Sequence, residues 1–366
     1  MRRSWLAAVV TASIMMSGLS GNGISWADRK TTVTDTAGRR VEVPSPPARI
    51  ICLSPGALRQ ICYLGEADKV VGVESLEKSR PMGRPYWLAH PELASLPVIG
   101  PGGPKSINEE PDLEAVLKVK PDVIFVTYMQ SSKADELQKK LGIPVVVLTY
   151  GRFEQFDEAV YDSLRVAGKA LKKEGRAEEI VAFARACQSD LQKKTEGFDS
   201  AKRPTVFAGA VGFKGTQGIE STDANYAPLE WVGADNVAKR SGKQGHLFVT
   251  KEQLLAWDPE IIFIDGGGLS LVRQDFERKP DFYRALRAVK NGRVYLLLPF
   301  NWYMTNVCTT ILDAYAVGKV LHPDRFADID LKRKADEVYT FFVGKPVHEQ
   351  MERDFGELGS PVSLGP

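Results

Sequence analysis

The chain has 366 residues, with 48 basic and 46 acidic side chains, and this near balance argues against nucleic acid as a partner. Arg2 and Arg3 account for the formal excess of +2, and both precede an apolar run over residues 6–19. With the small residues Ser25 and Ala27 after it, this pattern predicts a cleaved secretory signal peptide over residues 1–27. The run is too short for the alternative, a permanent membrane anchor. Because no Cys follows it, we expect a periplasmic protein without a lipid anchor.

Removal of the signal peptide leaves 339 residues, which predicts two lobes with separate apolar interiors. The four cysteines lie far apart without a CxxC pair, which excludes a zinc knuckle or a disulfide-stapled miniprotein. They are Cys52, Cys62, Cys187 and Cys308. One disulfide is possible in an oxidising compartment. We expect buried thiols instead, because Cys52 falls in an apolar strand and Cys187 and Cys308 fall in helical patterns.

The first half of the chain reads as strands alternating with helices. Residues 31–43 alternate as a short hairpin with its turn at Ala37 and Gly38. Continuous apolar runs of strand length follow at 49–53, 70–73, 123–127 and 145–148, separated by helical patterns. Such alternation predicts parallel strands joined by crossover helices, and the absence of polar alternation predicts strands covered on both faces.

The second half repeats this pattern after a long helical segment. Residues 153–196 read as one very long helix, or as two helices joined near Gly175. Strands resume at 205–208, 261–265 and 294–298, and helices close the chain at 305–321 and 331–342. We therefore expect an α/β protein of two Rossmann-like lobes with mostly parallel sheets. The expected boundaries are 28–155 for the first lobe, 156–196 for the linking helix and 197–366 for the second lobe.

One motif occurs in both halves. DLEAVLKVKPDVIFV covers residues 112–126 and KEQLLAWDPEIIFI covers residues 251–264. In each, a Glu begins a helix, a Pro follows seven positions later, and an acidic residue and an apolar strand come next. Proline ends the helix, and the acidic residue suits the tight turn that follows. A common Pro-acid turn explains the end of each motif but not the matching glutamates, so we interpret the two lobes as variants of one design.

Seven motifs occur in this chain in the order that is typical of one family. In these motifs the chain resembles the metal-chelate branch of the binding proteins of ABC importers, a branch that carries ferric siderophores, haem and cobalamin. The resemblance extends over nearly the whole mature chain. Its motifs are TDTAGRRVEVP, RIICLSPGALRQICYLG, KVVGVES, the motif at 112–126, GIESTDANYAPLEWVGADNVA, VTKEQLLAWDPEIIFI and NGRVYLLL. The resemblance implies two lobes bridged by one long helix, a shallow cleft between them and little hinge motion.

The resemblance also implies that Glu114 and Glu252 engage arginines of a dimeric membrane permease, because one surface Glu on each lobe does so in that family. A Glu in the first turn of a helix is favoured by the helix dipole, and when exposed it remains available for pairing. Ordinary helix-capping carboxylates are the alternative. The presence of both residues at equivalent places favours docking.

The ligand is expected at the loops that follow the strands, because ligands of open α/β sheets bind beyond the carboxyl ends of strands. These loops are rich in aromatic residues with polar tips, which suit a large, partly apolar chelate. The candidates are Ser54, Pro55, Lys105, Tyr128, Met129, Tyr150, Arg152, Phe213, Tyr226, His246, Asn301, Trp302 and Tyr303. Trp302 and Tyr303 are the strongest. Ordinary packing is the alternative for each ring, and capping of the last long helix is the alternative for Asn301 and Asn306.

Charge and composition narrow the ligand only in part. An anionic ferric siderophore would use Arg80, Arg84, Lys105 or Arg152, although solvated surface charge is the commoner role of such residues. None of the four histidines is paired at ligand spacing, which disfavours a bare zinc or manganese site, and His246 alone is an axial-ligand candidate for haem or cobalt. We expect a monomer without a cofactor of its own that binds a metal chelate. A ferric siderophore is favoured, and cobalamin, haem and nickel or cobalt chelates stay open.

Two other classes of protein are the alternatives. A periplasmic enzyme is disfavoured because the sequence has no GxSxG elbow and no HExxH motif, and its glycines at 209, 212 and 215 do not fit a dinucleotide fingerprint. A periplasmic sensory domain without a permease partner is the other alternative.

Overall fold

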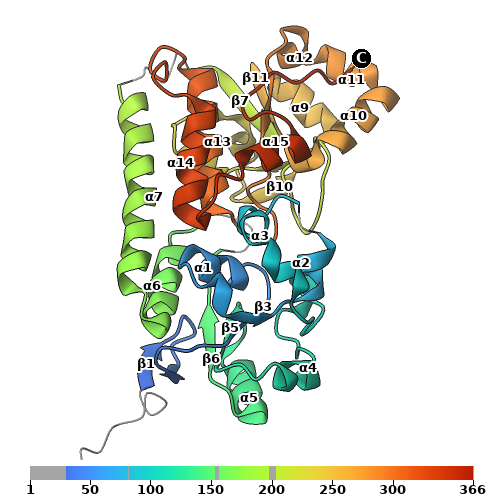
Figure 1. The fold of residues 1–366 in the computed structure, drawn as a ribbon. Coiled ribbons are helices and arrows are strands. Elements are labelled where there is room, and N and C mark those ends of the chain that lie inside the picture. Colours follow the sequence, from blue (N-terminus) through green and yellow to red (C-terminus); the bar gives the residue numbers. More distant parts are fainter. Residues whose placement is uncertain (1–29, 81, 153–155, 198–202, 366) are drawn as a thin grey trace, which may run out of the picture.

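The computed structural model describes residues 30–80, 82–152, 156–197 and 203–365, so the predicted signal peptide lies outside the described residues. The chain forms two α/β lobes, which lie one above the other in Figure 1, with the long helix α7 (Glu174–Thr195) along one side. In the described ranges, no helix combines the length and the apolar character needed to cross a bilayer.

The first lobe is built on a parallel sheet of order β4-β3-β5-β6, with an antiparallel hairpin of β1 and β2 beside it. Its strands are β1 (Lys30–Thr34), β2 (Arg40–Pro44), β3 (Ile50–Leu53), β4 (Val70–Gly72), β5 (Val123–Thr127) and β6 (Val145–Leu148). Its α-helices are α1 (Ala57–Tyr63), α2 (Ser75–Ser79), α3 (Pro85–Ala89), α4 (Leu113–Lys118) and α5 (Ser131–Leu141). Short 3-10 turns lie at Ala67–Lys69, Pro91–Ser95 and Pro104–Ser106.

The second lobe has a parallel sheet of order β12-β11-β7-β9 and an antiparallel pair of β8 and β10. Its strands are β7 (Thr205–Gly209), β8 (Ser221–Asp223), β9 (Asp235–Asn236), β10 (His246–Phe248), β11 (Ile261–Asp265) and β12 (Val294–Leu297). Its α-helices are α8 (Ala227–Glu230), α9 (Lys251–Trp257), α10 (Leu269–Arg278), α11 (Pro280–Ala285), α12 (Arg287–Lys290), α13 (Val307–Leu321), α14 (Leu331–Val343) and α15 (His348–Phe355). Its 3-10 turns are Val237–Ser241 and Gly266–Gly268.

The predicted strands are confirmed to within a residue or two, and the reason is their burial. All residues of β3, β5, β6 and β11 are buried, as expected of parallel strands covered by helices on both faces. The four cysteines are buried free thiols, which also confirms the prediction. The two-lobed α/β fold is therefore the one that the sequence predicts.

The segment that links the lobes is two helices and not one. Helix α6 (Ala159–Leu171) ends at Lys172, which adopts a left-handed conformation with φ 60°, and α7 begins at Glu174. The break falls three residues before Gly175, so of the two predicted alternatives the pair of helices joined near Gly175 is confirmed, and the single helix over 156–196 is not. Gly168 explains where the chain turns, because a side chain there would lie 2.9 Å from Cβ of Ala177. Only a glycine lets α6 and α7 pack this closely at the turn.

One apolar core is shared by both lobes, and each lobe also has a core of its own. The buried residues of the shared core come from α1 and β5 of the first lobe and from α13 and α14 of the second. The Tyr63 ring packs edge-on against Phe342 at 5.0 Å between centroids, and its hydroxyl lies 3.3 Å from the sulfur of Cys308. Separating the lobes would expose these side chains to water, which costs free energy in proportion to the apolar area uncovered. The shared core therefore opposes wide hinge opening.

The duplicated motif corresponds to a duplicated local structure. Asp112 caps α4 and Thr250 caps α9, each by accepting from a backbone N–H in the first turn. A left-handed residue precedes each proline, Lys120 with φ 44° and Asp258 with φ 38°. These equivalent features support the interpretation of two lobes on one design.

The acidic residue after each proline has a structural role beyond the turn itself. Oδ2 of Asp122 accepts from the backbone N–H of Arg49 at 2.9 Å, directly before β3. In the second lobe, Oε2 of Glu260 accepts from the N–H of Thr205 at 3.2 Å, where β7 begins. Each carboxylate thus ties the end of the motif to the first strand of its own sheet, which explains the acidic residue without any ligand.

Candidate ligand-binding cleft

A cavity of about 380 Å³ lies between the lobes. Its lining residues come from loops of both lobes: Pro55, Leu76, Arg80, Arg84, Gly102, Gly103, Pro104 and Lys105 from the first, and Lys214, Gly215, Asn301, Trp302, Tyr303 and Met304 from the second. Among the predicted ligand-binding residues, Pro55, Lys105, Asn301, Trp302 and Tyr303 are brought together here. The volume falls in the usual range of small-molecule sites.

The cleft is lined by positive charge. Arg80, Arg84, Lys105 and Lys214 contribute cationic side chains from both lobes, and none of the described lining residues is acidic. Arg80, Lys105 and Lys214 are exposed, whereas Arg84 is buried. Concave sites lined by one sign of charge attract ligands of the opposite sign. The arrangement suits an anion.

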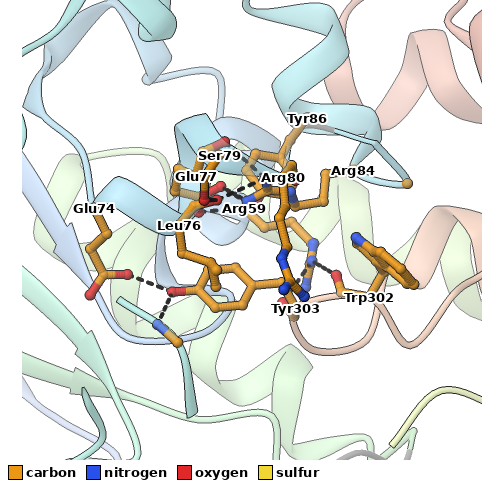
Figure 2. Close-up of polar contacts among 12 residues, drawn as sticks. Arg59, Glu74, Leu76, Glu77, Ser79, Arg80, Arg84, Tyr86, Trp302 and Tyr303 are labelled. Atoms are coloured by element: carbon orange, nitrogen blue, oxygen red, sulfur yellow. Dashed lines mark hydrogen bonds and ion pairs between the residues drawn. The ribbon is translucent and has the colours of Figure 1, made fainter. Parts of the chain in front are cut away.

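Tyr303 connects the two lobes through its hydroxyl group. It donates to Oε2 of Glu74 at 2.6 Å and accepts from the backbone N–H of Gly103 at 2.9 Å. Figure 2 shows the ring pointing toward Glu74, with Trp302 on its other side. The second carboxylate oxygen of Glu74 accepts from the N–H of Ser54 at 2.8 Å. Tyr303 is therefore a fixed part of the cleft wall.

A group of buried ionisable side chains lies behind this wall. Burial raises the pKa of the Glu74 carboxyl to about 7, while the bonds from Tyr303 and Ser54 oppose the rise. Burial also raises the pKa of Glu77, against the lowering effect of the neighbouring Arg84 guanidinium. Glu77 forms an ion pair with Arg84 and accepts from the Tyr86 hydroxyl at 2.8 Å. Because Arg84 is neutralised in this way, the exposed cations provide the excess positive charge of the cleft.

Arg59 holds the loop that carries Trp302 and Tyr303. Its guanidinium donates to the carbonyl oxygens of Trp302, Tyr303 and Thr305 at 2.8 to 3.1 Å. This loop needs support because Tyr303 and Met304 both have left-handed φ angles, of 58° and 68°. Such conformations cost energy in non-glycine residues and persist where the surroundings fix them.

Asn306 also supports this loop, in a way that the sequence did not predict. It stands at the N-cap of α13, but its side chain makes no capping bond. The amide donates instead to the carbonyl oxygens of Phe300 and Trp302, at 3.0 and 3.3 Å. The alternative of helix capping is therefore wrong for this residue.

Trp302 lies against two glycines, one from each lobe. A Cβ on Gly83 would lie 3.1 Å from the indole, and a Cβ on Gly267 would lie 2.9 Å from it. Phe355 contacts the indole edge-on at 6.3 Å between centroids. The missing side chains make room for the indole, so these glycines set its position in the cleft.

Five predicted binding residues lie outside the cleft lining, in the interior or partly buried. Ser54, Met129, Tyr150 and Tyr226 are at most 5% exposed, and Tyr128 is partly buried. The Tyr150 hydroxyl donates to the carbonyl of Gly56 at 3.0 Å, and its ring fills the space where Gly56 lacks a side chain. Gly56 therefore accommodates the Tyr150 ring, whereas its neighbour Pro55 lines the cleft.

Arg152, Phe213 and His246 are also absent from the cleft lining. Arg152 forms an ion pair with Asp157 at 3.1 Å, beside the linking helices. The Phe213 and His246 rings stack at 3.9 Å, and Nε2 of His246 lies 2.8 Å from Oγ of Ser221. Burial lowers the pKa of His246 to about 4, so the imidazole is neutral at physiological pH. Within the described ranges no three His, Cys, Asp or Glu side chains gather in a group suited to a metal ion.

The sequence missed Glu74, Arg59, Lys214 and the glycine-rich turn at 102–103. The sequence indicates only two of these as candidates. Lys214 lies in a loop after a strand, and the turn at 102–103 belongs to Pro-Gly-Gly-Pro-Lys, which is a conspicuous turn sequence. Glu114 and Glu252, the predicted docking residues, are exposed on α4 and α9. Figure 1 shows these helices in different lobes, both in the half of the molecule away from α7.

Two lobes with parallel sheets, linked by α6 and α7 around a cleft, are the architecture of a solute-binding protein. The chain belongs to the periplasmic binding protein family, whose model matches residues 50–299. Proteins of this family are substrate-binding components of ABC importers that deliver small ligands to a permease. The predicted resemblance is thereby confirmed at the level of the family.

Individual relatives differ in the ligands that they are named for. The molybdate-binding protein MolA of Haemophilus influenzae is 26% identical over 93% of this chain and 96% of its own length. Its molybdate-bound structure superposes with a TM-score of 0.68 at 23% identity, over 86% of this chain and 98% of that chain. The petrobactin-binding protein YclQ of Bacillus subtilis is 21% identical over 81% of this chain and 90% of its own. A periplasmic solute-binding protein of Veillonella parvula superposes with a TM-score of 0.71 at 23% identity. The superposition covers 89% of this chain and 97% of that chain.

Proposed function

We propose that this chain captures an anionic metal chelate, specifically a ferric siderophore, between its lobes and delivers it to an ABC permease. The observation that carries the proposal is the charge of the cleft. Its described lining residues include four cationic side chains, of which Arg84 is paired with Glu77, and no acidic side chain. Desolvated anions bind strongly only where fixed cations or N–H donors replace their water. A neutral or cationic ligand would gain nothing from these charges.

The size and apolar content of the cleft favour a chelate with an organic part. A volume of about 380 Å³ corresponds to about a dozen water molecules at roughly 30 Å³ each. A bare tetrahedral oxyanion, with five heavy atoms, would fill less than half of it. Leu76, Trp302 and Met304 add apolar surface that a ligand with rings or methylene groups can cover. Cation and indole surfaces together suit a ferric complex with anionic aromatic or carboxylate arms.

Molybdate is the second candidate, because of the similarity to MolA along almost the whole of both chains. Molybdate is an anion and therefore also suits the cationic lining. It would not cover the apolar part of the cleft, which would stay in contact with water. Haem and cobalt chelates bound through His246 are less favoured, because this ring is stacked on Phe213 and its Nε2 is engaged with Ser221.

Glu114 and Glu252 serve as the docking residues in this proposal. Both are exposed, and each lies in the first turn of an equivalent helix of its lobe. An exposed carboxylate is available for arginines of a permease dimer. Periplasmic location and the absence of catalysis stay predictions alongside this role.

The test is native mass spectrometry, with an absorption spectrum, of protein purified from its own host. The proposal predicts one bound ligand per chain, a mass that includes iron, and visible absorption from the ferric complex. A colourless adduct with the mass of molybdate would select the second candidate. A bound neutral ligand, or no bound ligand together with turnover of a small substrate, would overturn the proposal.

A further inference from the structure

Exposed apolar side chains repeat the duplication of the two glutamates. Among the described residues, six large hydrophobic side chains are exposed: Met82, Val98, Leu117, Phe248, Leu255 and Leu271. Two of the six, Leu117 and Leu255, occupy equivalent positions in the duplicated motif. Leu117 lies three residues after Glu114 and is 51% exposed, and Leu255 lies three residues after Glu252 and is 37% exposed.

The helices do not need these leucines for their own packing. Helix α4 buries Val116, and α9 buries the equivalent Leu254, in the lobe interior. The next residue along each helix is the exposed leucine. A polar residue at such a position ordinarily leaves stability unchanged, so folding does not account for a leucine at both places. A single exposed leucine is common on protein surfaces, but a matched pair beside matched carboxylates calls for a shared cause.

Helix geometry places each leucine beside its glutamate. Residues three apart on an α-helix lie on the same face, about 5–6 Å apart at Cβ. Each lobe therefore presents a carboxylate and an exposed isobutyl group side by side on a short helix. Helices α4 and α9 lie at opposite ends of the view in Figure 1, in different lobes. A partner that contacts both must span the two lobes and offer the same surface twice.

We propose that Glu114 with Leu117, and Glu252 with Leu255, form two equivalent Glu–Leu pairs on which the permease of the ABC importer docks. This inference rests on the proposed docking role of the glutamates and adds an apolar contact to each. Each half of the permease would then present a cation for the glutamate and, next to it, an apolar hollow for the leucine. The leucine excludes water from the neighbouring ion pair, and an ion pair is stronger where water is excluded.

The inference can be tested with the permease and ATPase of the importer that this chain serves, reconstituted in lipid nanodiscs. Binding of the full mature chain is measured for the wild type, Leu117→Gln, Leu255→Gln and the double variant. Burying about half of a leucine side chain predicts roughly fivefold weaker binding for each single variant and about 25-fold for the double. Leu271→Gln on α10 is the matched control, because Leu271 is also 37% exposed and is expected to leave binding unchanged. All variants should keep the wild-type Tm.

Glutamate variants and salt separate failure of this inference from failure of the proposed function. Glu114→Gln with Glu252→Gln should weaken binding at low salt and lose much of its effect at high salt, whereas the leucine effect should persist. Wild-type binding by the leucine double variant, with loss in the glutamate double variant, would overturn the Glu–Leu pairs and leave docking by glutamates intact. Wild-type binding by both double variants would overturn the docking role as well. An equal loss in Leu271→Gln would show that the leucines are not special, and would also overturn the inference.

Discussion

Replacing Tyr303 by Phe removes one oxygen atom from the contact between the lobes. That oxygen donates to Oε2 of Glu74 at 2.6 Å and accepts from the N–H of Gly103 at 2.9 Å. A hydrogen bond to a charged group contributes roughly 1.5–3 kcal/mol, so near pH 8 we expect the variant to lose about 2 kcal/mol of unfolding free energy. With an unfolding entropy of roughly 2.1 cal/mol/K per residue over the mature chain, this loss corresponds to a fall in Tm of about 3 °C.

The loss should depend on pH in a definite direction. The pKa of Glu74 in the folded protein is about 7, above the ordinary value of 4.5, so its protonated form is favoured by folding. The stability that this group contributes is therefore complete below pH 4.5 and is lost as the pH rises through 7. Tyr303→Phe removes an interaction that lowers this pKa, so the variant loses more stability at high pH. At pH 5, where the carboxyl is neutral, we expect the fall in Tm to be about half as large.

Scanning calorimetry at pH 5 and pH 8 measures both quantities. Tyr295→Phe is the control, because Tyr295 is a partly buried tyrosine of the same lobe on β12 and is expected to change Tm little at either pH. An unchanged Tm for Tyr303→Phe at pH 8, or a larger loss at pH 5 than at pH 8, would refute the reasoning.

Three further predictions concern ligand binding. Trp302→Ala should weaken binding of the captured chelate at least about tenfold, because an aromatic contact surface is lost. Titration calorimetry measures the affinity, and an unchanged affinity would show that Trp302 does not contact the ligand. Lys105→Gln with Lys214→Gln should weaken ligand binding and make the affinity less dependent on salt concentration. An unchanged dependence of the affinity on salt would show that these charges do not contact the ligand. Gly267→Ala should reduce affinity, because its Cβ would lie 2.9 Å from the Trp302 ring; tryptophan fluorescence that matches the wild type would contradict this displacement.

The fold could be predicted because its determinants are local. Apolar runs such as 123–127 and 261–265 are long enough to be recognised as strands, and the structure buries both completely. The duplicated motif was visible in the same way, as a helix, a proline and an acidic residue in fixed order. The helix break was predicted only as one of two alternatives, near Gly175. Its exact place at Lys172 has no local signal, because lysine favours helices and the close approach of Gly168 to Ala177 decides the turn.

The cleft could be predicted only in part. Loops after strands include Lys105, Trp302 and Tyr303, which line it, but also Tyr150, which is 1% exposed. Local sequence does not distinguish these tyrosines, because the space left by Gly56 lies 94 residues away from Tyr150 along the chain. Glu74 meets Tyr303 across 229 residues, and such pairings have no signature in either segment alone. Buried charges are found in a sequence only when their partners are already known.

The most direct test of an anion-binding cleft is equilibrium titration of the mature chain with defined probes. Ferric complexes of 2,3-dihydroxybenzoate, molybdate and a neutral cobalamin can be compared in the wild type and in the Lys105→Gln, Lys214→Gln variant. We predict one site for the ferric complex, weaker or no binding of the other two, and a marked loss in the variant. Saturable binding of the neutral probe alone, unaffected by the two lysine substitutions, would contradict the central claim.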